Sequence, residues 1–251
     1  MAKQTSRRIQ IIGKSLRFLE RYLFDPKLKK SLTLAVDELK LARNNHSNKE
    51  IVCFDIGANR GQTIRLFREL FPNSKIFAFE PNPEIYRSLN SIHRYSGNIK
   101  CFNLALGQRT GKFPFWISPL DETSSLLLPN SDSTMNKKKA LILGIDPKEM
   151  YEKIDVDVVT LDEFVLENKI LKIDILKIDV EGSEFQVLLG GRTVFKQGKV
   201  SIVQYEIHND DLRPSQQTEI NNFLKEFGFT EYSTIKHAFG DFADKIYIKR
   251  P

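Results

Sequence analysis

The feature that most constrains this chain is the apolar run at residues 51–56, which breaks directly into a turn ending at Gly61. The residues after the turn carry apolar side chains at helical spacing, namely Ile64, Leu66, Phe67 and Leu70. A second apolar run, residues 76–79, ends at Glu80, 19 residues after Gly61. A strand, a glycine turn, a helix and a second strand ending in a carboxylate are the parts with which an α/β sheet holds an adenosine-containing cofactor.

The composition of the turn indicates which cofactor it suits. The dinucleotide fingerprint is G-x-G-x-x-G, whereas this turn reads Gly57-x-Asn59-x-Gly61 and lacks the third glycine. Asp55 stands just before the turn, where a carboxylate would repel a pyrophosphate but attract a cation. S-adenosylmethionine carries a sulfonium and an ammonium group, so an acidic turn favours it. Asp55 and Gly57 should lie beside its methionine part, Asn59 and Gly61 should complete the turn, and Glu80 should accept hydrogen bonds from its ribose.

Five segments in register carry a resemblance to a known family: FDIGANRG (54–61), FEPNP (79–83), NLALG (103–107), TSSLL (123–127) and LKIDVEGSE (176–184). In this order they resemble the FkbM family of S-adenosylmethionine-dependent methyltransferases, and the resemblance covers about residues 50–207. It implies a class I methyltransferase fold closed by an antiparallel hairpin, with Asn103 and Ala105 at the adenine.

Strand-like and helix-like segments alternate along the chain, as doubly wound α/β folds require. Strands are expected near 51–56, 75–80, 99–104, 174–180 and 200–207, and helices near 61–71, 82–93, 161–168, 183–190 and 215–227. Shorter strands are expected at 113–117 and 156–160, with closing β runs at 229–236 and 245–248. We therefore predict that residues 50–251 form a doubly wound, mostly parallel, Rossmann-like sheet of seven strands. An insertion at about 118–150, rich in Ser, Asn, Pro and Lys, is either a lid over the site or a surface loop.

Residues 1–49 read as a separate basic arm. They hold 12 basic and 4 acidic side chains, a net charge of +8, whereas the rest of the chain has a net charge of −2. Two stripes at helical spacing predict a helical hairpin: Ile9, Ile12, Leu16, Leu19 and Leu23, then Leu28, Leu32, Ala35, Leu39 and Ala42. Asp25 and Pro26 suit the start of the second helix. The hairpin either docks on the catalytic domain or makes peripheral contact with an anionic membrane or a partner. Because the positive charge is confined to the arm, nucleic acid is not an expected partner.

Cysteine usage and hydropathy bear on the compartment. Cys53 and Cys101 both stand inside apolar runs, so we expect core thiols rather than a disulfide. The sequence shows neither a signal-peptide pattern nor an apolar stretch of about 20 residues. A cytoplasmic protein is the expectation, and the oligomeric state is left open.

Polar side chains follow the predicted fourth and fifth strands, where a doubly wound sheet binds its ligands. The candidate catalytic residues are Lys177, Asp179, Glu206 and His208. Methyl transfer requires an aligned acceptor and removal of its proton. Either His208 or Asp179 acts as the general base while Lys177 orients the hydroxyl, or Asp179, Glu206 and His208 bind Mg²⁺ or Mn²⁺. Glu181 is expected to be a carboxylate at a helix N-terminus.

These patterns together predict methyl transfer from S-adenosylmethionine to a hydroxyl oxygen. The resemblance implies diverse acceptors, so the acceptor is a small molecule or glycan of open identity, such as a sugar or a secondary metabolite. A non-catalytic cofactor-binding or scaffold protein is an alternative from a different class. An RNA methyltransferase would explain the basic arm, and a nicotinamide-dependent oxidoreductase would share the fold but needs the missing glycine.

Overall fold

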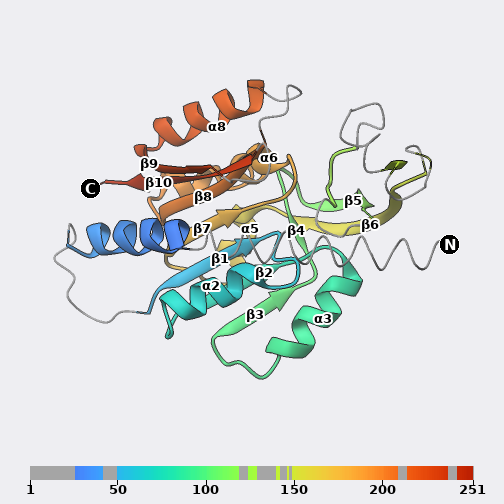
Figure 1. Ribbon diagram of the computed structural model, residues 1–251, viewed down its shortest axis with the longest axis horizontal. Helices are drawn as coiled ribbons and strands as arrows, with labels where there is room; N and C mark the ends of the chain where they lie inside the picture. The colour runs from blue at the N-terminus through green and yellow to red at the C-terminus, as the bar shows by residue number, and fades with distance from the viewer. Residues whose placement is uncertain are drawn as a thin grey trace.

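The computed structural model of the chain describes residues 26–41, 50–118, 124–128, 140–141, 146, 149–208, 214–236 and 242–250. A seven-stranded sheet runs through the middle of the molecule (Figure 1). Its strands, in spatial order, are β3 (Ile99–Phe102), β2 (Lys75–Phe79), β1 (Val52–Ile56), β7 (Ile173–Ile178), β8 (Val200–His208), β10 (Phe242–Lys249) and β9 (Phe229–Lys236).

The pairing of these strands confirms the predicted doubly wound sheet. The strands from β3 to β8 pair in parallel, whereas β10 pairs antiparallel with both β8 and β9. From β1 the chain winds outward to the β3 edge and then returns to place β7 on the other side of β1. The β1–β7 boundary is therefore the topological switch point, which is where open α/β sheets bind their ligands.

Alternation along the strands sends side chains to two helical layers. On one face, Cys53, Ile76 and Ile175 pack with α2 (Gln62–Leu70), α3 (Pro83–His93) and the helix at residues 26–41. The opposite face packs with α5 (Leu161–Glu167), α6 (Glu184–Leu189), α7 (Arg192–Lys196) and α8 (Pro214–Glu226). Cys53 is fully buried, Cys101 is partly buried, and both are free thiols, so their predicted place in the core is confirmed.

The helix at residues 26–41 docks on the sheet through the stripe that its sequence predicts. Its fully or nearly fully buried apolar side chains are Leu32, Ala35, Val36 and Leu39. Lys29 forms an ion pair with Glu69 of α2 at 2.7 Å, which ties the helix to its neighbour. The other predicted helix, at residues 9–23, together with Asp25 and Ala42, lies outside the described residues.

A second, three-stranded sheet was not predicted. It consists of β4 (Ala105–Leu106), β6 (Glu152–Val159) and β5 (Gly111–Ile117), in that order. We expected one strand over 99–104, but β3 ends at Phe102 because the side chain of Asn103 turns the backbone out of the strand. The Asn103 amide donates hydrogen bonds of 2.9 Å to the carbonyls of Glu80 and Pro81. The chain then pairs with β6, which begins four residues before the predicted strand because it also pairs with β5.

Part of the predicted insertion packs against this small sheet. Residues 124–128 are described, and Ser125 forms an antiparallel bridge with Trp116 of β5, with N–H to carbonyl distances of 2.9 and 3.1 Å. Most of residues 119–148 lies outside the described part. Within the described ranges, no helix combines the length and the apolar character that a membrane crossing requires.

Candidate cofactor site

The turn after β1 is shaped by two backbone requirements at Gly57. Its φ of 81° lies in the left-handed region, and a Cβ placed there would sit 1.9 Å from the carbonyl oxygen of Asp179. The N–H groups of Gly57 and Ala58 both donate to the carbonyl of Phe79, at 3.0 and 2.9 Å. Glycine is therefore required where the ends of β1, β2 and β7 meet. Gly61, with a φ of 78°, ends the turn as the N-cap of α2.

Glu80 follows β2 and closes the turn from the opposite side. Its Oε2 accepts a hydrogen bond from the backbone N–H of Asn59 at 2.9 Å, and its Oε1 accepts one from Asn82 at 2.8 Å. The side chain is 5% exposed, and this burial raises the pKa of Glu80 to about 7, although both backbone hydrogen bonds lower it. Each carboxylate oxygen has a further lone pair, so the pair of oxygens can accept the two hydroxyl hydrogens of a ribose diol.

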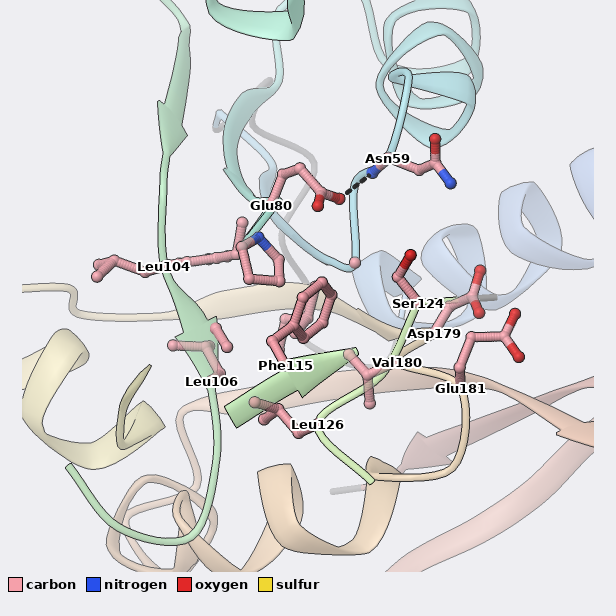
Figure 2. A pocket seen from close by; sticks show the side chains of 15 residues that line it. Asn59, Glu80, Leu104, Leu106, Phe115, Ser124, Leu126, Asp179, Val180 and Glu181 are labelled. Carbon is pink, nitrogen blue, oxygen red and sulfur yellow. Dashed lines mark hydrogen bonds between the residues drawn. The ribbon is translucent and has the colours of Figure 1, made fainter. Parts of the chain in front are cut away.

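The turn and Glu80 form the wall of a pocket at the switch point, shown in Figure 2. The pocket contains about 600 Å³ of empty space, part of it open to solvent. Glu80 and Asn59 lie at one end, and Ser124, Asp179 and Glu181 line another side. The rest of the wall is largely apolar and includes Leu104, Leu106, Phe115, Leu126 and Val180. A polar end beside an apolar slot suits a nucleoside, whose ribose is polar and whose base has apolar faces.

Behind this wall, Asp55 and Lys177 form a buried ion pair. The two residues are register partners on β1 and β7, and Lys177 Nζ lies 3.3 Å from Asp55 Oδ1. Burial raises the pKa of Asp55, against the opposing effect of the Lys177 charge. Burial alone would lower the pKa of Lys177, but the charges of Asp179 and Asp55 outweigh it and the pKa is raised. Asp55 is 0% exposed and neither residue lines the pocket, so the carboxylate lies behind the predicted methionine site rather than in its wall.

Three carboxylates gather beside the pocket. Oxygens of Asp179, Glu181 and Glu206 lie within 4.8 Å of one another. The structure thus brings together the predicted residues Asp179 and Glu206 and adds Glu181. The side chain of His208, at the end of β8, lies outside the described part of the structure. Carboxylates this close repel one another, so hydroxyl donors or a cation between them would be stabilising.

Glu181 does not occupy the position that the sequence predicts for it. We expected a carboxylate at a helix N-terminus, but α6 begins at Glu184 and Glu181 stands before it with a φ of 56°. Glu184 takes that role: its Oε1 accepts hydrogen bonds from the N–H groups of Gly182 at 2.9 Å and Val180 at 3.3 Å. The turn that Glu184 holds directs Glu181 to the pocket instead (Figure 2).

Residues 124–128 cover one side of the pocket and are fastened to the same turn. The Ser125 hydroxyl donates to the carbonyl of Glu181 at 2.9 Å and accepts a hydrogen bond from the N–H of Leu127 at 3.1 Å. Ser125 is 6% exposed, while its neighbours Ser124 and Leu126 line the pocket. This part of the predicted insertion is therefore a wall of the site, which sequence reasoning left undecided.

The predicted cofactor residues separate into two groups. Those that line the pocket are Gly57, Asn59, Glu80 and Ala105, joined by the predicted catalytic residue Asp179. Those outside the lining are Asp55, Gly61 and Asn103, as are the predicted catalytic residues Lys177 and Glu206. Asn103 secures the chain after Glu80 through its amide rather than facing the pocket. Asn82, expected to be an N-cap, is one: its Oδ1 accepts from the N–H groups of Glu84 and Ile85.

The strand order and the pocket at the switch point define a Rossmann-like fold of the methyltransferase type. Residues 55–231 match the family described as the methyltransferase FkbM domain, which is most of the chain. The chain belongs to the FkbM methyltransferase family, as the sequence resemblance implied.

Individual relatives are more distant. The chain is 25% identical over 154 residues to the 2-O-methyltransferase NoeI of Sinorhizobium fredii, a match that covers 61% of this chain and 63% of that protein. Similar solved structures include the precorrin-6y C5,15-methyltransferase of Geobacter metallireducens, at 11% identity and a TM-score of 0.43, with 88% of this chain and 87% of that chain covered. Another is the fibrillarin of Aeropyrum pernix, at 14% identity and a TM-score of 0.44, with 80% and 68% covered.

Proposed function

We propose that this protein transfers a methyl group from S-adenosylmethionine to an acceptor. The observation that carries the proposal is Glu80, which two backbone N–H groups hold at the wall of a switch-point pocket in a chain of the FkbM family. The apolar slot around Phe115 and Leu126 fits an adenine, and the Gly57 turn lies where the methionine part would follow. The nucleoside end of the cofactor thus has chemically matched partners in the pocket.

The acceptor atom in this proposal is a hydroxyl oxygen on a small molecule or glycan. The named activity of the NoeI relative, 2-O-methylation, supports an oxygen acceptor. Asp179, Glu181 and Glu206 supply carboxylate oxygens beside the pocket that can accept hydroxyl hydrogens. An alcohol has a pKa far above neutrality, so a base or a metal must help to remove its proton.

Two arrangements of this chemistry remain as proposals. In the first, Asp179 or His208 is the general base, and no metal takes part. In the second, Asp179 and Glu206 bind Mg²⁺ or Mn²⁺ together with Glu181 or His208, and the ion holds the acceptor oxygen. Oxygen ligands of this kind are those that Mg²⁺ and Mn²⁺ prefer. Activity that is lost on treatment with EDTA and restored by Mg²⁺ would favour the second arrangement, and activity indifferent to EDTA would favour the first.

The experiment that tests transfer itself uses S-adenosylmethionine with an isotopically labelled methyl group. The purified protein is incubated with a panel of sugars, oligosaccharides and hydroxylated secondary metabolites, and with RNA as a contrasting acceptor. Label found as an O-methyl ether by mass spectrometry supports the proposal, and label in RNA contradicts the acceptor class. Tight cofactor binding without transfer to any acceptor would instead favour a non-catalytic, cofactor-binding protein.

A further inference from the structure

The ammonium group of Lys177 is surrounded by three oxygens from three different parts of the site. Its Nζ lies 3.1 Å from Asp179 Oδ2, 3.3 Å from Asp55 Oδ1 and 3.4 Å from the carbonyl oxygen of Gly57. The contacts with Asp179 and Gly57 are hydrogen bonds and the contact with Asp55 is an ion pair, so all three oxygens face the positive charge of the ammonium group. Lys177 is 7% exposed and does not line the pocket. Lys177 therefore contacts two residues of the pocket wall, Gly57 and Asp179, without being part of that wall itself.

The three oxygens belong to segments whose relative positions define the shape of the pocket. Asp55 is the next-to-last residue of the buried strand β1, Gly57 begins the glycine turn, and Asp179 follows β7 in the pocket wall. The backbones of Gly57 and Asp179 already touch, since a Cβ on the glycine would lie 1.9 Å from the Asp179 carbonyl oxygen. The Lys177 ammonium also links these two residues, because it contacts the carbonyl of Gly57 and the carboxylate of Asp179.

We propose that Lys177 is a positioning residue for the cofactor, which acts by holding the Gly57 turn and the Asp179 carboxylate in the geometry that binds S-adenosylmethionine. This inference rests on the proposed function, because it assumes that the pocket binds that cofactor. The sequence predicted that Lys177 orients the acceptor hydroxyl. In the present proposal Lys177 instead acts through the residues that it contacts. The competing explanation is that Lys177 only neutralises the buried carboxylate of Asp55.

The two explanations predict different effects of Lys177→Met once the buried negative charge of Asp55 has been removed. In an Asp55→Asn background Lys177 no longer faces a fully buried carboxylate, so Lys177→Met should cost little stability there. The comparison is therefore between Asp55→Asn and the double variant Asp55→Asn/Lys177→Met, with melting temperature and S-adenosylhomocysteine affinity measured on both. Lys245→Met in the wild-type background is a matched control, since Lys245 is 8% exposed and pairs with Glu231 at 3.0 Å, outside the pocket lining.

The proposal predicts similar melting temperatures for Asp55→Asn and the double variant, but an affinity at least about tenfold weaker in the double variant, because the turn and Asp179 have lost their shared donor. Asp55→Asn/Lys177→Gln should recover part of the affinity, since an amide can still donate to either oxygen. An affinity in the double variant within about twofold of that of Asp55→Asn would overturn the proposal. So would equal losses with Gln and Met. Failure of the wild type to bind S-adenosylhomocysteine or S-adenosylmethionine would instead overturn the proposed function.

Discussion

Gly57 and Asp179 meet at the switch point with no room for a side chain between them. A Cβ on Gly57 would lie 1.9 Å from the Asp179 carbonyl oxygen, a distance that real Cβ atoms do not adopt. The segments that follow β1 and β7 can therefore approach each other this closely only because residue 57 has no Cβ. The glycine is needed here for its packing as well as for its φ of 81°.

Gly57→Ala should disrupt both the fold and the site. The positive φ and the clash with backbone atoms together should cost at least about 2 kcal/mol of unfolding free energy, and S-adenosylhomocysteine binding should become undetectable. Urea denaturation and calorimetry measure the two effects. Gly97→Ala is the matched control, because a Cβ at Gly97 meets no atom within 4 Å and should change the unfolding free energy by less than about 0.5 kcal/mol. Equal behaviour of the two variants would contradict the close approach.

The raised pKa of Glu80 predicts a pH dependence of stability in the absence of cofactor. Burial raises this pKa from 4.5 to about 7, so the folded state binds the proton more tightly than the unfolded state. Protonation of Glu80 therefore contributes about 3 kcal/mol to the unfolding free energy. This contribution is fully present below about pH 4.5 and is lost as the pH rises through about 7. Glu80→Gln cannot titrate and should lack this component. The difference between the two unfolding free energies, measured from pH 5 to 8, should therefore change with pH, and a constant difference would contradict the assignment.

The same group predicts an opposite pH trend for cofactor binding. A ribose diol donates to the ionised carboxylate, so binding should favour the form present above about pH 7. The affinity for S-adenosylhomocysteine should fall by up to about tenfold between pH 8 and pH 6 in the wild type. Titration calorimetry at both values measures this, and Glu80→Gln should bind weakly with little dependence on pH. A wild-type affinity that rises as the pH falls would be inconsistent with an ionised Glu80 in the complex.

Ser125 is predicted to hold the wall formed by residues 124–128. Ser125→Ala removes the donor to the Glu181 carbonyl and the acceptor for the Leu127 N–H, which should cost about 1–2 kcal/mol. Amide hydrogen exchange in residues 124–128 should accelerate, and cofactor affinity should fall several-fold. Ser91→Ala is the control, because the Ser91 hydroxyl donates only to the Ser88 carbonyl on an exposed part of α3. Unchanged exchange in residues 124–128 would show that the hydroxyl does not fasten them.

Docking of the helix at residues 26–41 makes a prediction about stability. Leu32 is fully buried against the sheet, whereas Leu34 on the same helix is 48% exposed. Leu32→Ala should lower the unfolding free energy by about 2–4 kcal/mol, because it leaves a cavity under the helix, and Leu34→Ala should lower it by less than about 1 kcal/mol. Chemical denaturation compares them directly. Similar small losses for both variants would mean that the helix adds little to the stability of the sheet.

Local patterns were enough to predict most of the large sheet and the position of Glu80. Apolar runs of strand length alternate with helical periodicity, and a glycine turn followed by a carboxylate has few other uses in an α/β chain. The break after β3 was not predictable in this way. It depends on the Asn103 amide, which reaches carbonyl groups 22 and 23 residues earlier in the chain. The apolar pattern of residues 99–104 contains no sign of those contacts.

The polar side of the site was only partly predictable for the same reason. Asp179 and Glu206 could be placed at strand ends, since strand ends share one edge of a parallel sheet. Glu181 was assigned to a helix start that belongs to Glu184, because the sequence pattern does not show that the backbone takes a positive φ at Glu181 and Gly182 before the helix begins. The link from Ser125 to Glu181 spans 56 residues and depends on tertiary packing. Sequence therefore predicted the residue types at the site better than their contacts.

Titration calorimetry of S-adenosylmethionine, S-adenosylhomocysteine and NAD against the wild type and Glu80→Ala tests the proposed cofactor pocket most directly. We expect micromolar binding of the first two ligands to the wild type, binding at least about tenfold weaker to Glu80→Ala, and no binding of NAD. Binding of NAD, or of none of the three ligands, by the wild type would contradict a methyltransferase pocket at the switch point.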